Sequence, residues 1–388
     1  MLRTISRTCC FAVMHWLLII SVISTAAAEV IIRPTPDGGV QPRMLVDSHG
    51  TVHLLYFKKR LSAPSAREGN LYYRQYLVAE NRFGTPIKVS SQAFNVQTVS
   101  ISRASMALDG AGRVHVIWYL PRAEQYYYAR SNTQRNQFEP QQSMVSEYVD
   151  GIDAGAEIAA YGTQVAIVWG AGALVREYER TAFVRLSHDS GSSFGPEMMV
   201  SDPELGACAC CSLASEYMSD SELIIAYRSA LNGIGRHMQL LTLSLVDNEV
   251  SGAAYGPVDE LQQWELSACP LSTNDIAIDA NLDRWLIFET ASRIVQKNLN
   301  SERPPSLVGE PFSQTRQKNP AVAFNNKGQR LIVWGEAISH SRGGRLNMRL
   351  FEGETAENNV DFTEEITIPN FSFPAAASLP NGDFLVLY

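Results

Sequence analysis

The chain has 388 residues, of which 45% are hydrophobic, and it carries a formal net charge of −8. An acidic chain is a poor partner for nucleic acid and for anionic membrane surfaces, so we expect neither as a ligand. Six cysteines are present, and the four beyond the first ten residues all lie between positions 208 and 269, which predicts one local feature instead of a distributed disulfide framework.

Residues 1–28 have the composition of a secretory signal peptide. Arg3 and Arg7 precede the apolar run "FAVMHWLLIISVIS", and "TAAAE" offers a cleavage site that ends at Ala28. The alternative, an uncleaved membrane anchor, is disfavoured because a span needs about 20 apolar residues. We therefore expect a secreted or periplasmic protein with no membrane span after signal removal, in which residues 29–388 form a single domain.

Four later segments superpose without a gap and predict β-hairpins. They are "PRMLVDSHGTVHLLY" from Pro42, "ASMALDGAGRVHVIW" from Ala104, "PAVAFNNKGQRLIVW" from Pro320 and "PAAASLPNGDFLVLY" from Pro374. Each has a glycine at its ninth position and an aromatic residue at its fifteenth. Two apolar strands around a glycine-bearing turn are typical of a hairpin.

Three looser copies end at Trp169, Tyr227 and Phe288, and consecutive copies start 50 to 62 residues apart. This period leaves room for two more strands between hairpins, which predicts the four-stranded antiparallel blades of an all-β propeller. Seven hairpins favour seven blades. The segment "EVIIRP" from Glu29 is expected to supply an outer strand that closes the ring.

The segment "LSHDSGSSF" from Leu186 raises the question of a nucleophile or a cation loop. It lacks the glycine of a nucleophile elbow and has too few acids for an EF-hand. It follows the third hairpin, where the outer strands of a blade should turn. We expect Asp189 to accept hydrogen bonds from turn amides, Gly191 to take a positive φ, and Phe194 to pack into the blade.

The spacing of Ser187, Asp189, Gly191 and Phe194 resembles the Asp-box, or BNR repeat, of the sialidase (neuraminidase) superfamily. Together with the hairpins, the resemblance covers essentially the whole chain after the signal. It implies a sialidase-like propeller, usually with six blades in that family. It also implies a structural role for this turn, because the family's boxes lie away from its active site.

The resemblance further implies three arginines that hold a substrate carboxylate, a tyrosine nucleophile paired with a glutamate, and an acid/base aspartate. Arginine suits this task because its planar fork forms two parallel hydrogen bonds to a carboxylate. The family's first arginine lies in an R-I-P motif. The closest matches here are "IIRPTP" with Arg33 and "QPRM", where Gln41 occupies the arginine position, so the sialidase set is incomplete.

Several charged residues flank the inner hairpins on a single face of the predicted ring, so they are candidates for a shared site, with solvated loop charges as the alternative. The candidate catalytic residues are Arg228, Arg236 and Glu336. The candidate substrate-binding residues are Arg103, Arg122, His237 and Glu289.

The cysteines form the motifs "GACACC" and "SACP". The residue before each hairpin should face the channel, which places Cys210 and Cys269 at one height on neighbouring blades, with Cys208 and Cys211 beside them. Three interpretations remain open: a Cys210–Cys269 or Cys211–Cys269 disulfide, a Cu or Zn site with Cys210, Cys211 and Cys269 as ligands, and a redox-active or nucleophilic thiol. The pattern resembles a "CxCC … CP" cluster of exported bacterial sialidase-like proteins.

Two hypotheses of function follow. The first is an exported glycan-processing hydrolase that acts on a carboxylated sugar and needs no cofactor. The second is a non-catalytic propeller that binds a glycan or a protein, with the cysteines as a structural cluster. Fold alone does not decide between them.

Overall fold

The structure of the chain is a computed structural model. It describes residues 28–60, 68–95, 103–120, 123–153, 155–208, 211–246, 249–250, 255–308, 315–337, 342–353, 356–358 and 365–388. The predicted signal before Ala28, Arg122 and Cys210 lie outside the described residues.

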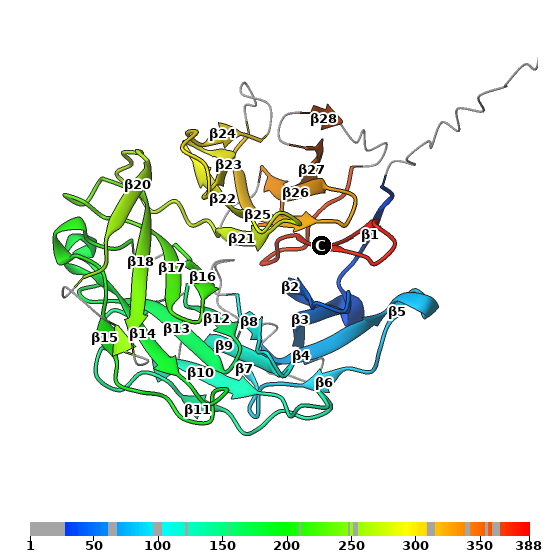
Figure 1. Ribbon diagram of the computed structural model, residues 1–388, viewed down its shortest axis with the longest axis horizontal. Coiled ribbons are helices and arrows are strands. Elements are labelled where there is room, and N and C mark those ends of the chain that lie inside the picture. Colours follow the sequence, from blue (N-terminus) through cyan, green and yellow to red (C-terminus); the bar gives the residue numbers. More distant parts are fainter. Residues whose placement is uncertain are drawn as a thin grey trace, which may run out of the picture.

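In the described part of the chain, seven sheets are arranged around a central axis, as Figure 1 shows. Blade 1 consists of β2 (Val40–Val46), β3 (Val52–Lys59), β4 (Glu68–Leu77), β5 (Arg82–Phe83), β6 (Ile87–Lys88) and β7 (Phe94–Asn95). Blade 2 consists of β8 (Ser105–Leu108), β9 (Val114–Leu120), β10 (Gln125–Arg130) and β11 (Gln142–Ser143). Blade 3 consists of β12 (Glu157–Tyr161), β13 (Gln164–Ala171), β14 (Thr181–Ser187) and β15 (Met198–Met199).

The remaining blades complete the ring. Blade 4 consists of β16 (Ala214–Ser219), β17 (Glu222–Arg228), β18 (Met238–Val246), β19 (Glu249–Val250) and β20 (Val258–Gln262), and blade 5 of β21 (Asp275–Ile278), β22 (Arg284–Thr290), β23 (Arg293–Asn298) and β24 (Ser306–Leu307). Blade 6 consists of β25 (Gln317–Phe324), β26 (Gln329–Glu336), β27 (Arg345–Glu352) and β28 (Ala356–Asn358). Blade 7 consists of β29 (Ala375–Ser378), β30 (Phe384–Leu387) and β1 (Val30–Arg33). The prediction of an all-β propeller with seven blades is confirmed.

Helices are scarce, as predicted. Within the described ranges they are the short 3₁₀ segments η1 (Pro36–Gly38), η2 (Val78–Glu80), η5 (Glu177–Glu179) and η6 (Pro203–Leu205). None of the described helices is long and apolar enough to cross a bilayer.

All seven predicted hairpins form the two inner strands of a blade, and in five of them a glycine with a positive φ lies in the turn. In the first hairpin Val46 pairs with Val52, and Gly50 between them has a φ of 80°. The preceding Asp47 closes the turn, since its Oδ1 accepts hydrogen bonds from the amides of His49 and Thr51 at 2.9 and 2.8 Å. Asp109, Asp279 and Asn325 repeat this arrangement in three other blades. Local chemistry therefore sets the register of the inner hairpins.

The N-terminal strand closes the ring, as expected, but its direction differs from that of a regular blade. β1 pairs with β30 in parallel, with Val30 opposite Phe384 and Arg33 opposite Leu387. The third strand of the other blades is antiparallel to the second. The last blade is thus built from both ends of the described chain.

The strands are apolar on both faces because each sheet is covered by its two neighbours. Leu55 of blade 1 and Val116 of blade 2 share one buried cluster, and Val168 of blade 3 shares another with Ile225 of blade 4. These inter-blade layers form the core of the protein. The inner strands also carry a few charged side chains, and these line the central channel instead of packing between blades.

The Ser187–Phe194 turn joins β14 and β15 on the face of the ring that carries the inner-hairpin turns. Asp189 accepts hydrogen bonds from the amide and the hydroxyl of Ser193 at 2.9 and 2.7 Å, and Gly191 has a φ of 73°. The Phe194 ring contacts Tyr128 of the neighbouring blade edge to face, with 5.0 Å between centroids. This geometry is that of a turn that connects two blades.

Candidate functional site

The inner strands enclose two cavities along the central channel, of about 160 and 260 Å³. Arg43 of β2 and Glu216 of β16 line both of them. Glu157 of β12 lines the smaller cavity, and Asp275 of β21 lines the larger one. Four blades thus contribute charged side chains to a channel whose other walls are mainly apolar.

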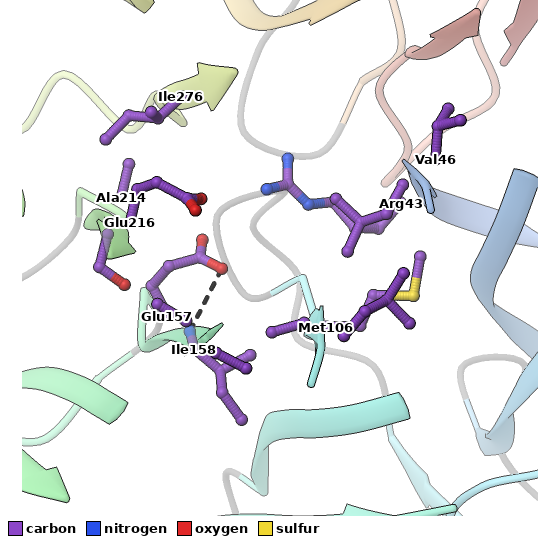
Figure 2. A pocket seen from close by; sticks show the side chains of 14 residues that line it. Arg43, Val46, Met106, Glu157, Ile158, Ala214, Glu216 and Ile276 are labelled. Carbon is purple, nitrogen blue, oxygen red and sulfur yellow. Dashed lines mark hydrogen bonds between the residues drawn. The ribbon is translucent and has the colours of Figure 1, made fainter. Parts of the chain in front are cut away.

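The channel charges face one another. Figure 2 shows Arg43, Glu157 and Glu216 pointing toward the same space. Arg43 forms a salt bridge with Asp275, whose other oxygen accepts a hydrogen bond from the amide of Val322 at 3.0 Å. Opposite charges packed this closely satisfy one another in a region where water is restricted.

Burial changes the acid–base behaviour of the channel carboxyls. It raises the pKa of Glu216 to about 7, and the nearby charge of Glu157 adds to the effect while Arg284 and Arg43 oppose it. Burial also raises the pKa of Glu157, against the influence of Arg43. A carboxyl group that keeps its proton near neutral pH in a cavity is equipped to act as a general acid.

Arg103 lies just before β8 and lines neither of the two cavities. Its Nη2 donates to the main-chain oxygen of Asn274 at 2.9 Å, and its guanidinium lies 5.5 Å from the centroid of the Phe373 ring. Burial and the neighbouring charge of Arg43 lower the pKa of Arg103 to about 10. This predicted substrate-binding residue is buried and connects the segment that leads into blade 2 with blades 5 and 7.

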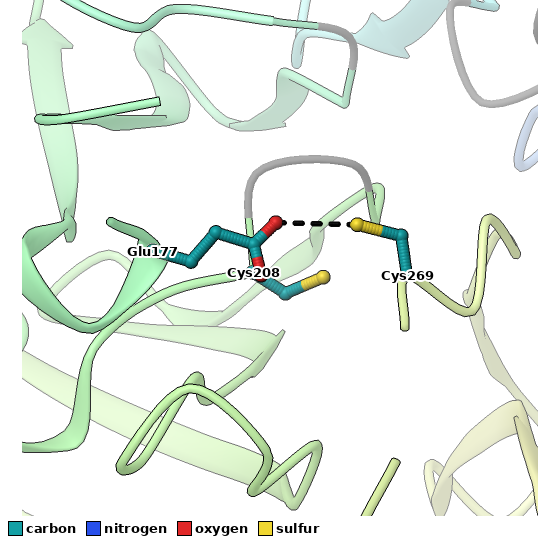
Figure 3. Close-up of side chains that lie close together, drawn as sticks. All are labelled: Glu177, Cys208 and Cys269. Carbon is teal, nitrogen blue, oxygen red and sulfur yellow. Dashed lines mark hydrogen bonds between the residues drawn. The ribbon is translucent and has the colours of Figure 1, made fainter. Parts of the chain in front are cut away.

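The structure brings three of the four predicted cysteines together, on the face opposite the inner-hairpin turns. Sγ of Cys208 lies 3.2 Å from Sγ of Cys211. Sγ of Cys269 lies 3.2 Å from Oε1 of Glu177, and single ligand atoms of Glu177, Cys208 and Cys269 all lie within 4.8 Å of one another (Figure 3). The fourth cysteine, Cys210, belongs to the segment outside the description.

Arg236 borders this cluster, and the main-chain oxygen of Arg228 accepts a hydrogen bond from the amide of Cys208. Nη2 of Arg236 lies 2.6 Å from Oε2 of Glu177, and its Nε donates to the main-chain oxygen of Ala268 at 3.1 Å. Arg228 is buried and donates to the main-chain oxygens of Arg236 and Glu289. Both guanidinium groups are thus bonded to other groups of the protein, and they are not arranged together to bind a substrate carboxylate in the channel.

The other predicted site residues occupy separate places. His237 accepts a hydrogen bond from the amide of Trp264 at 3.0 Å. Glu289 is fully buried, which raises its pKa, and Arg316 lies 3.6 Å from its carboxylate. Glu336 accepts a hydrogen bond from Gln317 at 2.8 Å in blade 6. Within the described residues, these groups do not converge with the cysteines or with the channel charges.

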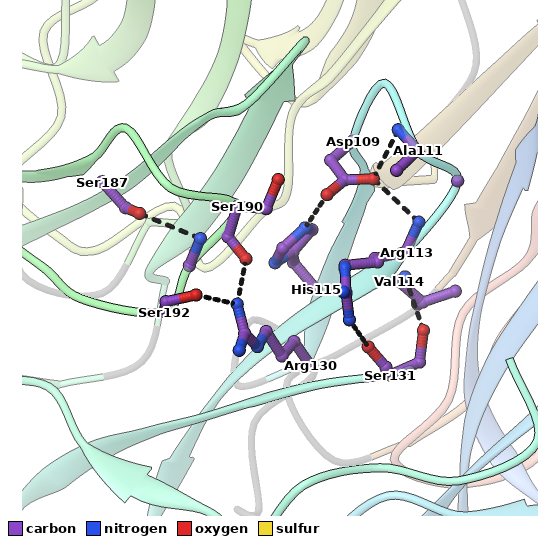
Figure 4. A network of polar contacts seen from close by, with 12 residues as sticks. Asp109, Ala111, Arg113, Val114, His115, Arg130, Ser131, Ser187, Ser190 and Ser192 are labelled. Carbon is purple, nitrogen blue, oxygen red and sulfur yellow. Dashed lines mark hydrogen bonds and ion pairs between the residues drawn. The ribbon is translucent and has the colours of Figure 1, made fainter. Parts of the chain in front are cut away.

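A buried Asp–His–Tyr network has the look of a catalytic triad but recurs as a structural unit. Nε2 of His115 lies 3.3 Å from Asp109 (Figure 4). Its Nδ1 lies 2.7 Å from the Tyr128 hydroxyl. His53, Asp47 and Tyr73 repeat the arrangement in blade 1, at 3.1 and 2.6 Å. Burial lowers the pKa of both histidines, so they stay neutral. Because the same three residue types recur in two blades, we infer a structural role: the network bonds the inner-hairpin turn to the second and third strands of its blade.

Sequence reasoning missed Arg43, Glu157, Glu216 and Asp275 because it examined the residue just before each hairpin. The available signal was a single charge inside an otherwise apolar inner strand, as in "GAEIAAYG" around Glu157. Glu177 was missed because it lies on a loop of a different blade from the cysteines that it meets.

Comparison with known proteins supports the fold. No protein-family model and no curated protein matches the chain. A protein of unknown function from Dyadobacter fermentans matches with a TM-score of 0.53 and 10% identity, over 83% of this chain and 96% of that chain. The Penicillium chrysogenum α-L-arabinanase, solved with arabinobiose, matches with a TM-score of 0.51 and 9% identity, over 84% and 98%.

The Trypanosoma rangeli sialidase matches with a TM-score of 0.50 and 10% identity, over 81% of this chain and 56% of that chain. At such identities the likeness shows the fold alone. The chain therefore has the sialidase-like propeller architecture that the sequence predicted.

Proposed function

We propose that this chain is an exported glycan-processing propeller that binds a sugar in its central channel and cleaves a glycosidic bond there. The observation that carries the proposal is Glu216, a carboxyl group with a pKa of about 7 that shares a cavity with Arg43 and Asp275. The printed names of two similar structures, an arabinanase and a sialidase, agree with a glycan as substrate.

Glycoside hydrolysis requires two carboxyl groups in different protonation states. Glu216 holds its proton near neutral pH and is the proposed general acid that protonates the leaving oxygen. Asp275 forms a salt bridge with Arg43 and accepts a hydrogen bond from the amide of Val322, so its carboxylate is the proposed partner of Glu216. The two environments thus assign the two roles.

A carboxylated sugar is the substrate class that the channel favours. Arg43 lines both cavities, and a guanidinium group is the side chain best suited to a carboxylate. The arginines selected from the sequence do not supply this function together, because Arg103, Arg228 and Arg236 donate to main-chain oxygens. Carboxylate recognition in this proposal therefore depends on Arg43.

The test is hydrolysis of fluorogenic sialosides, glucuronides and neutral arabinosides by the purified chain. Loss of a general acid costs about 10²- to 10⁴-fold in rate, so we expect at least a hundredfold loss in Glu216→Gln. Glu222→Gln is the matched control, since Glu222 begins the next strand of the same blade at the turn face. Hydrolysis that survives in Glu216→Gln contradicts the proposed acid.

The second candidate is a non-catalytic glycan- or protein-binding propeller. It is favoured by the salt bridge between Arg43 and Asp275, which already satisfies the main charges of the channel. Calorimetric titration with glucuronic acid oligosaccharides separates the two candidates. Binding without turnover supports the second one, and turnover supports the first.

A further inference from the structure

Three segments from three blades meet at the cysteine cluster. Glu177 comes from η5 in blade 3, Cys208 and Cys211 from the loop that leads into β16 of blade 4, and Cys269 from the loop that leads into β21 of blade 5. Glu177 and Cys269 are 92 residues apart in the chain, yet their side chains are in contact. A convergence of donors from distant segments indicates a site that the fold builds.

The spacing of the donor atoms suits one metal ion. Zinc binds thiolate sulfur at about 2.3 Å in a tetrahedron, which places two sulfur ligands about 3.8 Å apart. Cys208 and Cys211 are 3.2 Å apart, and the donor atoms of Cys208, Cys269 and Glu177 lie within 4.8 Å of one another. Cys211 does not belong to the three donors that lie within 4.8 Å of one another, so its side chain would have to move toward Cys269 and Glu177 to complete a tetrahedron.

The scaffold holds these donors in place. The amide of Ala207 donates to the main-chain oxygen of Glu177 at 3.2 Å, and the amide of Cys208 donates to that of Arg228 at 2.9 Å. Arg236 lies 2.6 Å from one oxygen of Glu177, while the other oxygen faces Cys269. Such an outer partner fixes the orientation of a ligating carboxylate and offsets negative charge.

We propose that Cys208, Cys269 and Glu177 bind a zinc ion, and that Cys211, whose Sγ lies 3.2 Å from that of Cys208, moves in as the fourth donor when the ion binds. A carboxylate oxygen in the donor set favours zinc over Cu(I), which selects sulfur donors. Four protein donors leave no open position, so the ion is structural and ties blades 3, 4 and 5 together at the face opposite the inner-hairpin turns. The proposal is independent of the proposed hydrolase activity.

The test measures metal content and ligation in the full chain. Plasma mass spectrometry of protein purified without chelators should find about one zinc per chain. After chelation and addition of Co²⁺, the protein should show the near-ultraviolet charge-transfer absorption of cobalt–thiolate bonds. Cys269→Ser should lose both signals.

Glu177→Gln tests the carboxylate ligand, and Glu179→Gln is its matched control on the same 3₁₀ turn, where Glu179 is exposed and pairs with Arg176 at 3.0 Å. We expect at least tenfold weaker zinc binding in Glu177→Gln, and wild-type binding in Glu179→Gln. Because glutamine is close in size to glutamate, this pair remains informative if Cys269→Ser does not fold.

Two outcomes would overturn the proposal. One is a disulfide between Cys269 and Cys208 or Cys211 in peptides mapped without reduction. The other is wild-type protein that has reduced thiols and neither retains zinc nor binds added Co²⁺, which would leave the redox-active thiol as the remaining interpretation.

Discussion

The hydroxyl oxygen of Tyr128 lies 2.7 Å from Nδ1 of His115, and both side chains are completely buried. His115 is neutral because burial lowers its pKa, so its Nδ1 accepts from Tyr128 while its Nε2–H faces Asp109. The inner-hairpin turn of blade 2 is thereby bonded to the third strand of the same blade.

Tyr128→Phe should lower the free energy of unfolding by about 1–3 kcal/mol, because it leaves a buried acceptor on His115 without its donor. Tyr127→Phe is the matched control, since Tyr127 precedes Tyr128 in β10 and its side chain is only half-buried. Urea titration of both variants checks the prediction. Equal stabilities of the two variants would show that the network contributes nothing.

Gly191→Ala should destabilise the protein more than Gly328→Ala. Both glycines have a positive φ, so both variants bear the backbone cost of about 1 kcal/mol. A Cβ at Gly191 would also lie 1.8 Å from Oη of Tyr128, whereas nothing lies within 4 Å of a Cβ at Gly328. Overpacking adds about 1–3 kcal/mol. Thermal melting of both variants should therefore separate them, and coinciding curves would refute the contact between blades.

Asp189→Ala should lower stability by about 1 kcal/mol without loss of activity, because Asp189 only holds turn amides and hydroxyls. Hydrogen bonds from Ser193 outweigh the cost of burial and lower the pKa of Asp189 to about 2. Its contribution is therefore complete above the unfolded pKa of 3.8 and is lost as the pH falls through about 2. An unchanged melting temperature at pH 7 combined with lost activity would reverse the assignment.

Glu216→Gln should raise the melting temperature, and by more at pH 8 than at pH 5. Burial raises the pKa of Glu216 from 4.5 to about 7, so the folded state binds the proton more tightly than the unfolded state. Stability from this group is thus present at low pH and lost as the pH rises through about 7. At pH 8 the wild type must ionise a buried carboxyl and the variant need not. A shift that is larger at pH 5 would contradict the raised pKa.

The repeats made the fold predictable. The ninth-position glycine and the fifteenth-position aromatic residue are local features, and the hairpins they specify form with the predicted pairing. The closure by β1 was also visible as an apolar segment without a partner, although its parallel direction was not. Local patterns carry this information because a hairpin is bonded within a short stretch of chain.

The sites were harder to predict because they consist of contacts between blades. The motif "CxCC" indicated the cysteines, but Glu177 joins them from a loop of another blade. Arg43 and Asp275 form a salt bridge across 232 residues of chain. No spacing in the sequence specifies such a pair, because the curvature of the ring decides which inner strands face each other.

The central claim is that Glu216 is the general acid of a channel site, and the pH dependence of kcat/KM tests it most directly. With whichever glycoside the chain hydrolyses, kcat/KM should fall as the pH rises through about 7, since Glu216 then loses the proton that it must donate. This descending limb should be absent from the residual activity of Glu216→Gln. A descending limb that persists unchanged in Glu216→Gln would contradict the account.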